Sequence, residues 1–525
     1  MSNSENVVEA SDILHPLLLP ELLLQIGPYL SQAAALNCVL VCRTWNSCLT
    51  PFLFQRVTLH KRQILNGSKR ALRPMISALQ RYAPNIQTLI CHDNNAILRQ
   101  IGPQCTSIET LVLGKITLEV LPILRLCKDV LVRLEFTPER RTQPLTYTRS
   151  SNNNNCGLMP GHINELLDAI MDLSKLEHLV LDYIGLKSDE QLDSFFTYCQ
   201  RLFSLELHQT AVFGAAPSTL VFNNMRSISF IDCAIPLSDQ LMLMMQCPHL
   251  NHITWIRKAH ILPMEMMGTL MKVERRELKS LNISNGVSSD LSMATALAQL
   301  TSLETLIARA TQFGPASMTV LLDYLSSQLQ VLDLMDCHEV ASEMVDRIMG
   351  TCTTLKSLSM DRVRALDVIE HSQWVCDGLE ELRVVFVGPS CLSSNETQHA
   401  IYNKIATLRR LRVLSLGRNG STTRWSAKSV LDLSLAGGLG QLAPLTELRE
   451  FDFCQMPHRL GMGEFKFMLR CWPKLETMHG HLNADRDRAA FVESYLRNER
   501  PGIRLRNNLR YGRNPIQTEL GFSSC

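Results

Sequence analysis

Residues 328 to 334 read QLQVLDL, and the same spacing of apolar residues returns along most of the chain. In this stretch Leu329 is followed by two variable residues, then Leu332, one variable residue and Leu334. The last two leucines alternate with Asp333, a pattern typical of a short strand with one apolar face. Apolar residues at helical spacing follow, as in MVDRIMGTC at 344 to 352. Each copy of the pattern therefore predicts one strand and one helix.

The copies of this pattern are regularly spaced. Their first positions differ by 23 to 37 residues from Leu176 onward, and most of the steps lie in the mid-twenties. A period of 20 to 29 residues with this spacing is the signature of leucine-rich repeats. We count twelve clear copies, which begin at Ile108, Leu176, Leu202, Met225, Leu250, Leu278, Leu303, Leu329, Leu355, Leu379, Leu411 and Leu448, and three weaker ones at Ile86, Leu131 and Leu475.

These fifteen coils predict an α/β solenoid. A single coil cannot bury its own apolar face, so neighbouring coils stack, with a parallel sheet on one side and helices on the other. We expect a leucine-rich-repeat horseshoe with the sheet on the concave side, the helices on the convex side, and three short helices before the first coil.

Composition limits the classes of partner. Lys and Arg number 52 against 50 Asp and Glu, a formal net charge of +2, so no overall field favours nucleic acid or a membrane. The N-terminal stretch has neither a signal peptide nor a membrane span, which predicts an intracellular protein in the cytoplasm and/or nucleus. Several of the 17 cysteines recur at the same position of a coil, which favours reduced, buried thiols over disulfides or a metal site.

The segment before the coils is unusually apolar for its length. Three short helices in fewer than fifty residues cannot bury so many large apolar side chains among themselves. The run Leu19-Pro20-Glu21-Leu22, an apolar ladder through Ile26, Leu30 and Leu36, and then Val41-Cys42-Arg43 with Trp45, resembles the F-box over residues 16 to 58. Together with the coils, the chain is similar to the F-box/leucine-rich-repeat class.

This resemblance implies a function. An F-box docks onto the Skp-type adaptor of a cullin-RING ubiquitin ligase, while the repeats hold the protein that is ubiquitinated and degraded. Carried over by position, the residues that would form or brace the adaptor-facing surface are Leu19, Pro20, Leu23, Ile26, Val41, Cys42 and Trp45.

Two features depart from the F-box pattern. Gly27-Pro28 falls inside the usual first helix, and Pro28 cannot donate a backbone hydrogen bond to Leu24, so this helix should end early or kink. Ala33 and Ala34 replace the acid that often precedes the second helix. Ser31 is a suitable N-cap for this helix.

An alternative function is also open. These helices could serve only as a cap on the first coils of an interaction scaffold unrelated to ubiquitination.

The resulting domain prediction covers the whole chain. It assigns residues 1–15 to a disordered N-terminus, 16–58 to the F-box, 59–83 to a linker or N-terminal cap, 84–484 to the repeats with a loop insertion at 138–162, and 485–525 to a C-terminal cap or tail. Eight arginines lie between 485 and 513 with interspersed acids, which favours a polar cap over a polyanion-binding tail.

Residues on either side of the second leucine of each coil should line the concave face, because side chains alternate along a strand. Most are small and neutral, as expected for a protein-binding surface or for a merely solvated sheet. We take as candidate substrate-binding residues His178, Glu206, His252, Asn282, Asp333, Arg383 and Glu450.

No motif predicts catalysis, a cofactor or a metal. Gly438 to Ala443 satisfies G-x-G-x-x-A, but the unpatterned lead-in and Pro444 argue against a dinucleotide site. His479 and His481 with Asp485 lack a second ligand cluster. The leading hypothesis is therefore a non-catalytic substrate receptor of an SCF-type (Skp-cullin-F-box) ubiquitin ligase.

Overall fold

The structure is a computed structural model, and it divides into two compact units. One unit comprises Met1–Met225 with Cys233–Cys247, and the other comprises Arg226–Asp232 with Pro248–Cys525. The residues described are 19–59, 69–92, 95–114, 117–136, 160–182, 185–186, 189–212, 216–256, 277–286, 289–370, 374–388, 395–417, 431–454, 456, 460–480, 482 and 486–506.

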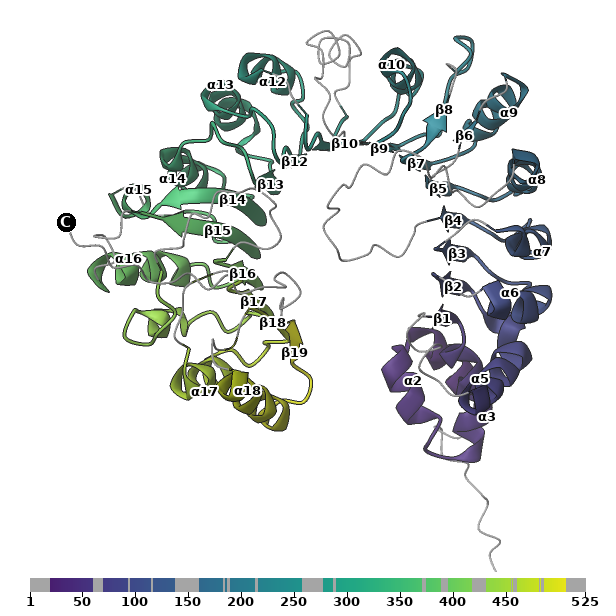
Figure 1. Ribbon diagram of the computed structural model, residues 1–525, viewed down its shortest axis with the longest axis horizontal. Coiled ribbons are helices and arrows are strands. Elements are labelled where there is room, and N and C mark those ends of the chain that lie inside the picture. Colours follow the sequence, from purple (N-terminus) through teal and green to yellow (C-terminus); the bar gives the residue numbers. More distant parts are fainter. Residues whose placement is uncertain are drawn as a thin grey trace, which may run out of the picture. The chain divides into compact units, whose positions relative to one another are not determined.

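The first unit begins with a helical group and continues as repeating coils (Figure 1). The helical group contains α1 (Pro20–Ile26), a 3₁₀ turn (Gly27–Tyr29), α2 (Gln32–Cys38) and α3 (Arg43–Leu53). The coils contribute the strands β1 (Arg56–Leu59), β2 (Thr88–Cys91), β3 (Thr110–Leu113), β4 (Arg133–Phe136), β5 (His178–Asp182) and β7 (Ser204–His208). Their helices are α5 (Lys69–Tyr82), α6 (Asn95–Ile101), α7 (Leu121–Leu126), α8 (Pro160–Met171), α9 (Asp189–Cys199) and α10 (Leu237–Met245), and a small parallel pair joins β6 (Gly185–Leu186) to β8 (Ala211–Val212).

The second unit continues the same plan (Figure 1). Its strands are β9 (Ser227–Ile231), β10 (His252–Ile256), β11 (Ser280–Asn282), β12 (Thr305–Ile307), β13 (Val331–Leu334), β14 (Ser357–Arg364), β15 (Glu381–Val387), β16 (Val413–Ser415), β17 (Glu450–Asp452), β18 (Thr477–His479) and β19 (Arg504–Arg506). Its helices are α12 (Asp290–Leu297), α13 (Pro315–Val320), α14 (Ser342–Thr351), α15 (Ala365–Glu370), α16 (Asn395–Ala406), α17 (Met462–Cys471) and α18 (Arg486–Glu499).

The strand register confirms the repeat prediction. Each of the fifteen predicted coils contains a strand, and within each unit consecutive strands pair in parallel, with leucine opposite leucine in Leu281, Leu306 and Leu332. These leucines are buried between the sheet and the helices, whereas the residues beside them lie on the other face, which we call the open face. The predicted α/β leucine-rich-repeat solenoid is thus confirmed as a stack of parallel strands covered by helices.

Each unit has one strand outside the predicted coils. β1 pairs with β2, and β19 pairs with β18. Pro160 already begins α8, so the last residues of the predicted loop insertion 138–162 are helical, and the rest of that loop lies outside the described residues. The predicted disordered segment 1–15 and residues 507–525 of the predicted tail also lie outside them. No helix among the described residues is long and apolar enough to cross a bilayer.

The recurring cysteines pack as buried thiols. The Cys127 thiol donates a hydrogen bond to the carbonyl oxygen of Cys105 one coil earlier, at 3.2 Å, and the Cys376 thiol donates to the Cys352 carbonyl oxygen at 2.9 Å. All fourteen cysteines in the described part of the chain are free thiols. Their fixed position in the coil therefore reflects a small side chain that fits the corner between helix and strand.

Candidate protein-interaction surfaces

The helical group at the N-terminus follows from its own sequence. Pro20 occupies the first turn of α1, where its missing N–H costs nothing, and Glu21 lies next to it. The predicted early end is confirmed: α1 ends at Ile26, and a 3₁₀ turn carries Pro28. The Ser31 hydroxyl accepts a hydrogen bond from the Ala34 N–H at 3.2 Å, which confirms it as the N-cap of α2.

These helices form a small core of their own. Leu23, Val39 and Leu49 are its buried members, and Trp45 and Phe52 pack against them, partly buried. The 3₁₀ turn after α1 approaches α3 closely at Gly27, where a Cβ would lie 2.3 Å from the Phe52 ring. The helical group therefore holds its shape through side chains that the chain itself supplies.

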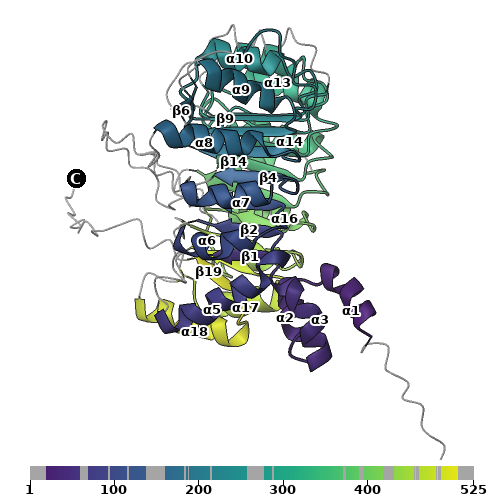
Figure 2. The same ribbon diagram turned by 90° about the vertical axis from the view of Figure 1, so that its right-hand side faces the viewer.

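A large apolar surface remains outside this core. Of the eighteen large apolar side chains that are exposed in the described residues, seven lie between positions 22 and 41. They are Leu22, Leu24, Ile26, Tyr29, Leu36, Leu40 and Val41, and we call them the apolar patch. No Asp, Glu, Lys, Arg or His occurs from Leu22 to Cys42, so the patch is uncharged as well as apolar. Figures 1 and 2 show α1–α3 at the β1 end of the first unit.

The seven residues assigned by resemblance fall into three groups. Pro20, Ile26 and Val41 are exposed. Leu23 is buried, and Trp45 packs on the same core, so these two can brace the surface from behind. Leu19 and Cys42 are intermediate. The resemblance to the F-box did not single out Tyr29 and Leu40, the two most exposed members of the patch. The absence of charged residues around them in the sequence could have indicated them.

The helical group also touches the first strand. The Gln32 side-chain amide donates hydrogen bonds to the carbonyl oxygens of Leu53 and Arg56, at 3.1 and 3.2 Å. The Phe54 ring stacks on the Tyr82 ring of α5, with 4.6 Å between centroids. These contacts lie at the C-terminal end of α3, and the side chains of the apolar patch stay exposed.

On the open face of the first unit, two predicted residues lie on neighbouring strands. His178 is half-buried with its ring edge against Phe203, 5.8 Å between centroids, and burial together with nearby Arg133 lowers its pKa. Glu206 lies 3.4 Å from the imidazole of His208. Both positions face away from the core, as their alternation with buried leucines predicted.

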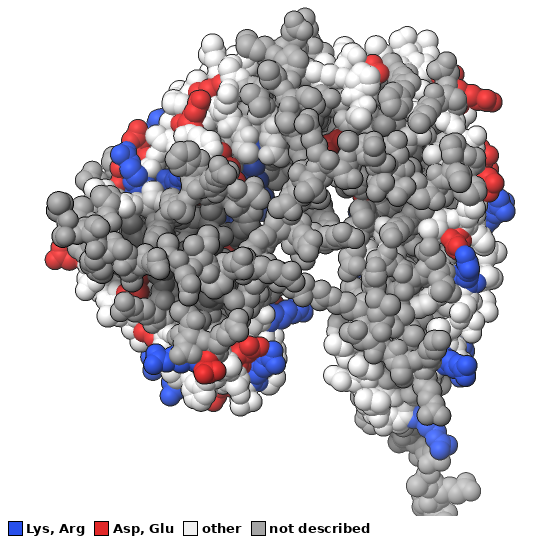
Figure 3. All heavy atoms as spheres, viewed as in Figure 1, with Lys and Arg blue, Asp and Glu red and all other residues white. Residues whose placement is uncertain are grey.

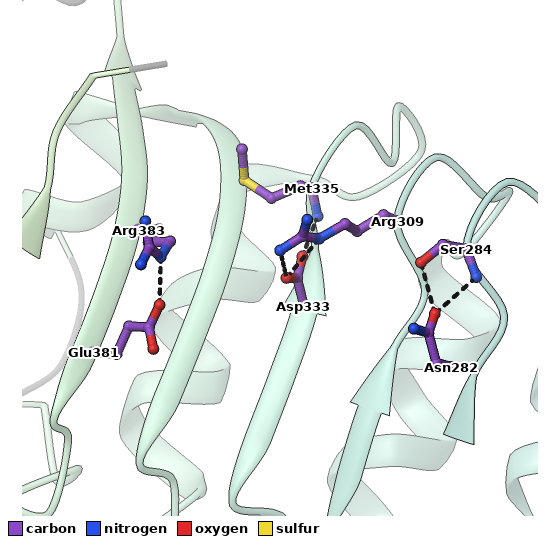
Figure 4. Close-up of polar contacts among 7 residues, drawn as sticks. All are labelled: Asn282, Ser284, Arg309, Asp333, Met335, Glu381 and Arg383. Atoms are coloured by element: carbon purple, nitrogen blue, oxygen red, sulfur yellow. Dashed lines mark hydrogen bonds and ion pairs between the residues drawn. The ribbon is translucent and has the colours of Figure 1, made fainter. Parts of the chain in front are cut away.

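On the open face of the second unit, several predicted residues already have partners in the chain. Asp333 is almost completely buried and accepts hydrogen bonds from the Arg309 guanidinium and the Met335 N–H (Figure 4). The Asn282 side-chain oxygen accepts from the hydroxyl and the N–H of Ser284, so it stabilises its own turn. His252 is exposed.

The remaining two predicted residues belong to one cluster. Arg383 pairs with Glu381 on the same strand (Figure 4), and its guanidinium lies 3.7 Å from Glu450 on β17. Glu450 lies 3.5 Å from the His479 imidazole on β18. The sequence suggested His479 only as part of a possible metal pair with His481, which lies outside the described residues. No group of three or more metal-ligating side chains occurs in the described part of the chain.

The G-x-G-x-x-A stretch has a packing role. Gly438 has φ +111°, and a Cβ there would lie 2.9 Å from both His399 and Tyr402. The residues after it form a short 3₁₀ turn, in which Leu439 and Leu442 are buried. This close approach explains the glycine without any ligand.

Charged side chains of both signs are interspersed over the described surface in Figure 3. Positive and negative charges are thus mixed on this face, as the near-zero net charge of the whole chain would suggest. The apolar patch between Leu22 and Val41, in contrast, carries no charge.

Comparisons with known proteins address both parts of the chain. A family model described as F-box-like matches residues 20–60. No curated protein matches the chain in sequence. Among solved structures, the chain is similar to the leucine-rich-repeat protein LIC12759 of Leptospira interrogans, with TM-score 0.36 and 15% identity over 82% of this chain and 97% of that one.

Two further solved structures are similar at the same level. An internalin (inlF) of Listeria monocytogenes has TM-score 0.32 and 14% identity over 65% of this chain and 82% of its own. A TLR13–ssRNA13 complex has TM-score 0.37 and 14% identity over 77% of this chain and 54% of its own. At these TM-scores the assignment of the fold rests on the strands of the chain itself. Residues 20–60 thus match an F-box-like domain, and the parallel strand-and-helix coils that follow have the leucine-rich-repeat fold.

Proposed function

We propose that the chain is a non-catalytic substrate receptor of an SCF-type ubiquitin ligase, inside the cell in the cytoplasm and/or nucleus. Its F-box would bind a Skp-type adaptor and, through it, a cullin-RING ligase. Its repeats would bind a protein that is then ubiquitinated and degraded. The receptor would contribute proximity, since bringing two reactants together can supply a large part of a rate enhancement.

The apolar patch is the observation that carries this proposal. Large apolar surfaces exposed on soluble proteins usually mark sites that bind another molecule. Here seven large apolar side chains lie on twenty residues whose own core is already filled by Leu23, Val39 and Leu49. A partner that covers the patch gains apolar burial without having to complete the fold of the helical group.

The test is co-purification of the full-length chain with a Skp-type adaptor. Wild type is compared with the double variant Ile26→Glu, Val41→Glu, which places two charges on exposed positions of the patch. A matched control is Leu291→Glu, at an exposed leucine of α12 outside the patch. We expect wild type and the control to retain the adaptor and the patch variant to lose it.

Variants at Leu23 or Trp45 are less informative, because both side chains pack in the core of the helical group. Equal recovery of the adaptor with wild type and the Ile26→Glu, Val41→Glu variant would reject the receptor function.

A second candidate function is an interaction scaffold whose N-terminal helices only cap the sheet. The hydrogen bonds from Gln32 to the ends of α3 and β1 favour it, since they fix the helical group on the first strand. In that case no adaptor would co-purify with any variant.

A further inference from the structure

Five side chains gather on the open face of the second unit. They are Glu381 and Arg383 on β15, Glu450 and Asp452 on β17, and His479 on β18. Phe451, between the two acids, packs against Trp472 in the core at 5.2 Å between ring centroids. Because side chains alternate along a strand, Glu450 and Asp452 both project from the opposite, open face.

The buried member of this cluster has an unused oxygen. Asp452 is 0% exposed, and its Oδ1 accepts a hydrogen bond from the Cys454 N–H at 2.9 Å. Its Oδ2 has no hydrogen-bond partner among the described residues. The neighbouring hydroxyl of Ser415, opposite Asp452 in the register, donates instead to the Gly417 carbonyl oxygen.

The neighbour on the other side does not satisfy Asp452 either. His479 lies opposite Asp452 in the register and is 6% exposed. Its Nε2 lies 3.5 Å from Glu450 and makes no hydrogen bond with the described residues. Asp452 and His479, on paired strands, thus each keep a buried polar atom that makes no hydrogen bond with the described residues, and such groups are costly to bury.

The five side chains of the cluster do not balance in charge. Three carboxylates face one guanidinium, Arg383, which is held by Glu381 and lies 3.7 Å from Glu450. With His479 neutral these five side chains carry a formal charge of −2, and Arg504 of β19, on the same face, lies two strands from Glu450 in the register. The Glu450 side chain is 31% exposed, so a cation can reach it from the open face.

We propose that this cluster is the part of the open face that recognises a lysine or arginine side chain of the bound protein. The ammonium or guanidinium group donates to Glu450, and Asp452 behind it supplies the uncompensated negative charge. Glu381 and Arg383 hold each other at the edge of the site. This inference deepens the proposed receptor function, because it gives the chemistry of the substrate.

The experiment uses the full-length chain and a fluorescein-labelled peptide of alternating lysine and glycine, with a glutamate and glycine peptide as the negative probe. Binding is followed by fluorescence anisotropy for wild type and for Glu450→Gln, Asp452→Asn. The matched control is Glu447→Gln, Glu476→Gln, which removes the same number of charges just before β17 and β18. There Glu447 pairs with Lys474 and Glu476 with Arg449.

We expect the site variant to bind the lysine peptide about tenfold more weakly than wild type, because a charge-assisted hydrogen bond is lost. The control should stay within about twofold, as surface substitutions usually do. If spermidine competes as well as an equal concentration of unlabelled peptide, the site takes free polyamines and the protein-substrate assignment is wrong. Equal weakening by the control would mean unspecific charge attraction and would overturn the proposal.

Two further measurements keep the result interpretable. Glu450→Gln alone changes only a partly exposed residue, so it replaces the double variant if that one does not fold. His479→Gln is compared with wild type in thermal stability. If His479→Gln is less stable while Glu450→Gln binds the peptide as wild type does, Glu450 and His479 only stabilise the fold and the proposal fails. Adaptor co-purification depends on the apolar patch and is measured separately. A negative result in peptide binding would therefore not reject the proposed receptor function.

Discussion

Asp290 and Ser317 join two consecutive coils by reciprocal hydrogen bonds. The Asp290 carboxylate accepts from the Ser317 N–H at 3.0 Å, and the Ser317 hydroxyl donates back to the Asp290 carbonyl oxygen at 3.0 Å. The same carboxylate also accepts from the N–H groups of Gly314 and Ala316. A residue at the start of α12 therefore caps α13, whose own N-cap residue is a glycine without a side chain.

We predict that Asp290→Ala destabilises the second unit by about 1–2 kcal/mol, the usual cost of losing an N-cap side chain. The measurement is the urea midpoint, with amide hydrogen exchange at Ala316 and Ser317 as a local readout. Asp323→Ala, at an exposed position of the coil that contains α13, is the control and should leave both readouts unchanged. Identical exchange in Asp290→Ala and wild type would contradict the cap.

The same contact predicts a pH dependence. Burial raises the pKa of Asp290, but the hydrogen bonds from Ser317, Ala316 and Gly314 outweigh burial, so that the pKa is lowered overall. A lowered folded-state pKa gives a stabilisation that is present above the unfolded value of about 3.9 and is lost as pH falls through the folded value. The difference in urea midpoint between wild type and Asp290→Ala should therefore shrink below about pH 4. A constant difference would argue against an ionised cap.

Gly438→Ala should destabilise the second unit by about 1–3 kcal/mol, because it forces a side chain into a left-handed conformation. The new methyl would also lie 2.9 Å from His399 and Tyr402. Gly502→Ala is the matched control, since nothing lies within 4 Å of a Cβ at that position. Thermal unfolding of the two variants tests this, and similar midpoints would contradict the packing role.

Leu23→Ala should destabilise the helical group by about 2–5 kcal/mol, as for other buried leucines. Leu40→Ala, at a residue that is 77% exposed, should leave its stability unchanged within about 0.5 kcal/mol. Hydrogen exchange at the amides of α3 measures the difference. If both variants exchange alike, Leu23 does not belong to the core.

The buried thiols should resist alkylation. Burial raises the pKa of Cys105 and of Cys376 to about 12, so almost no thiolate forms at neutral pH. Mass spectrometry after brief treatment of the native chain with N-ethylmaleimide should find label on the partly exposed Cys42 and Cys471 first. Early label on Cys105 would show that its coil opens readily.

The repeats could be predicted from the sequence because each coil buries its side chains at the same three apolar positions of the pattern. Only the ends were missed. Phe54, Val57 and Leu59 do satisfy the spacing of the pattern, but they directly follow α3, and the first two were assigned to the F-box and Leu59 to the linker. β19 keeps only Leu505 at the position of the second leucine, so its pattern was too weak to find.

The interaction surfaces were less accessible to sequence reasoning. Alternation placed Asp333 and Glu450 on the correct face, but not their partners. Arg309 follows the last apolar residue of its own coil and reaches across to the next strand, and His479 approaches Glu450 only through the parallel register. For the helical group, resemblance marked both Leu23 and Val41, whereas only three-dimensional packing separates the buried from the exposed residue.

The uncharged apolar patch has a consequence for the chain on its own. From Leu22 to Cys42 no charge opposes self-association, and gatekeeping charges are what normally prevents it. We expect the chain produced without a partner that covers the patch to precipitate or bind chaperones. Its steady-state amount would then follow the supply of that partner, since an orphan copy is a substrate for the cell's own quality control.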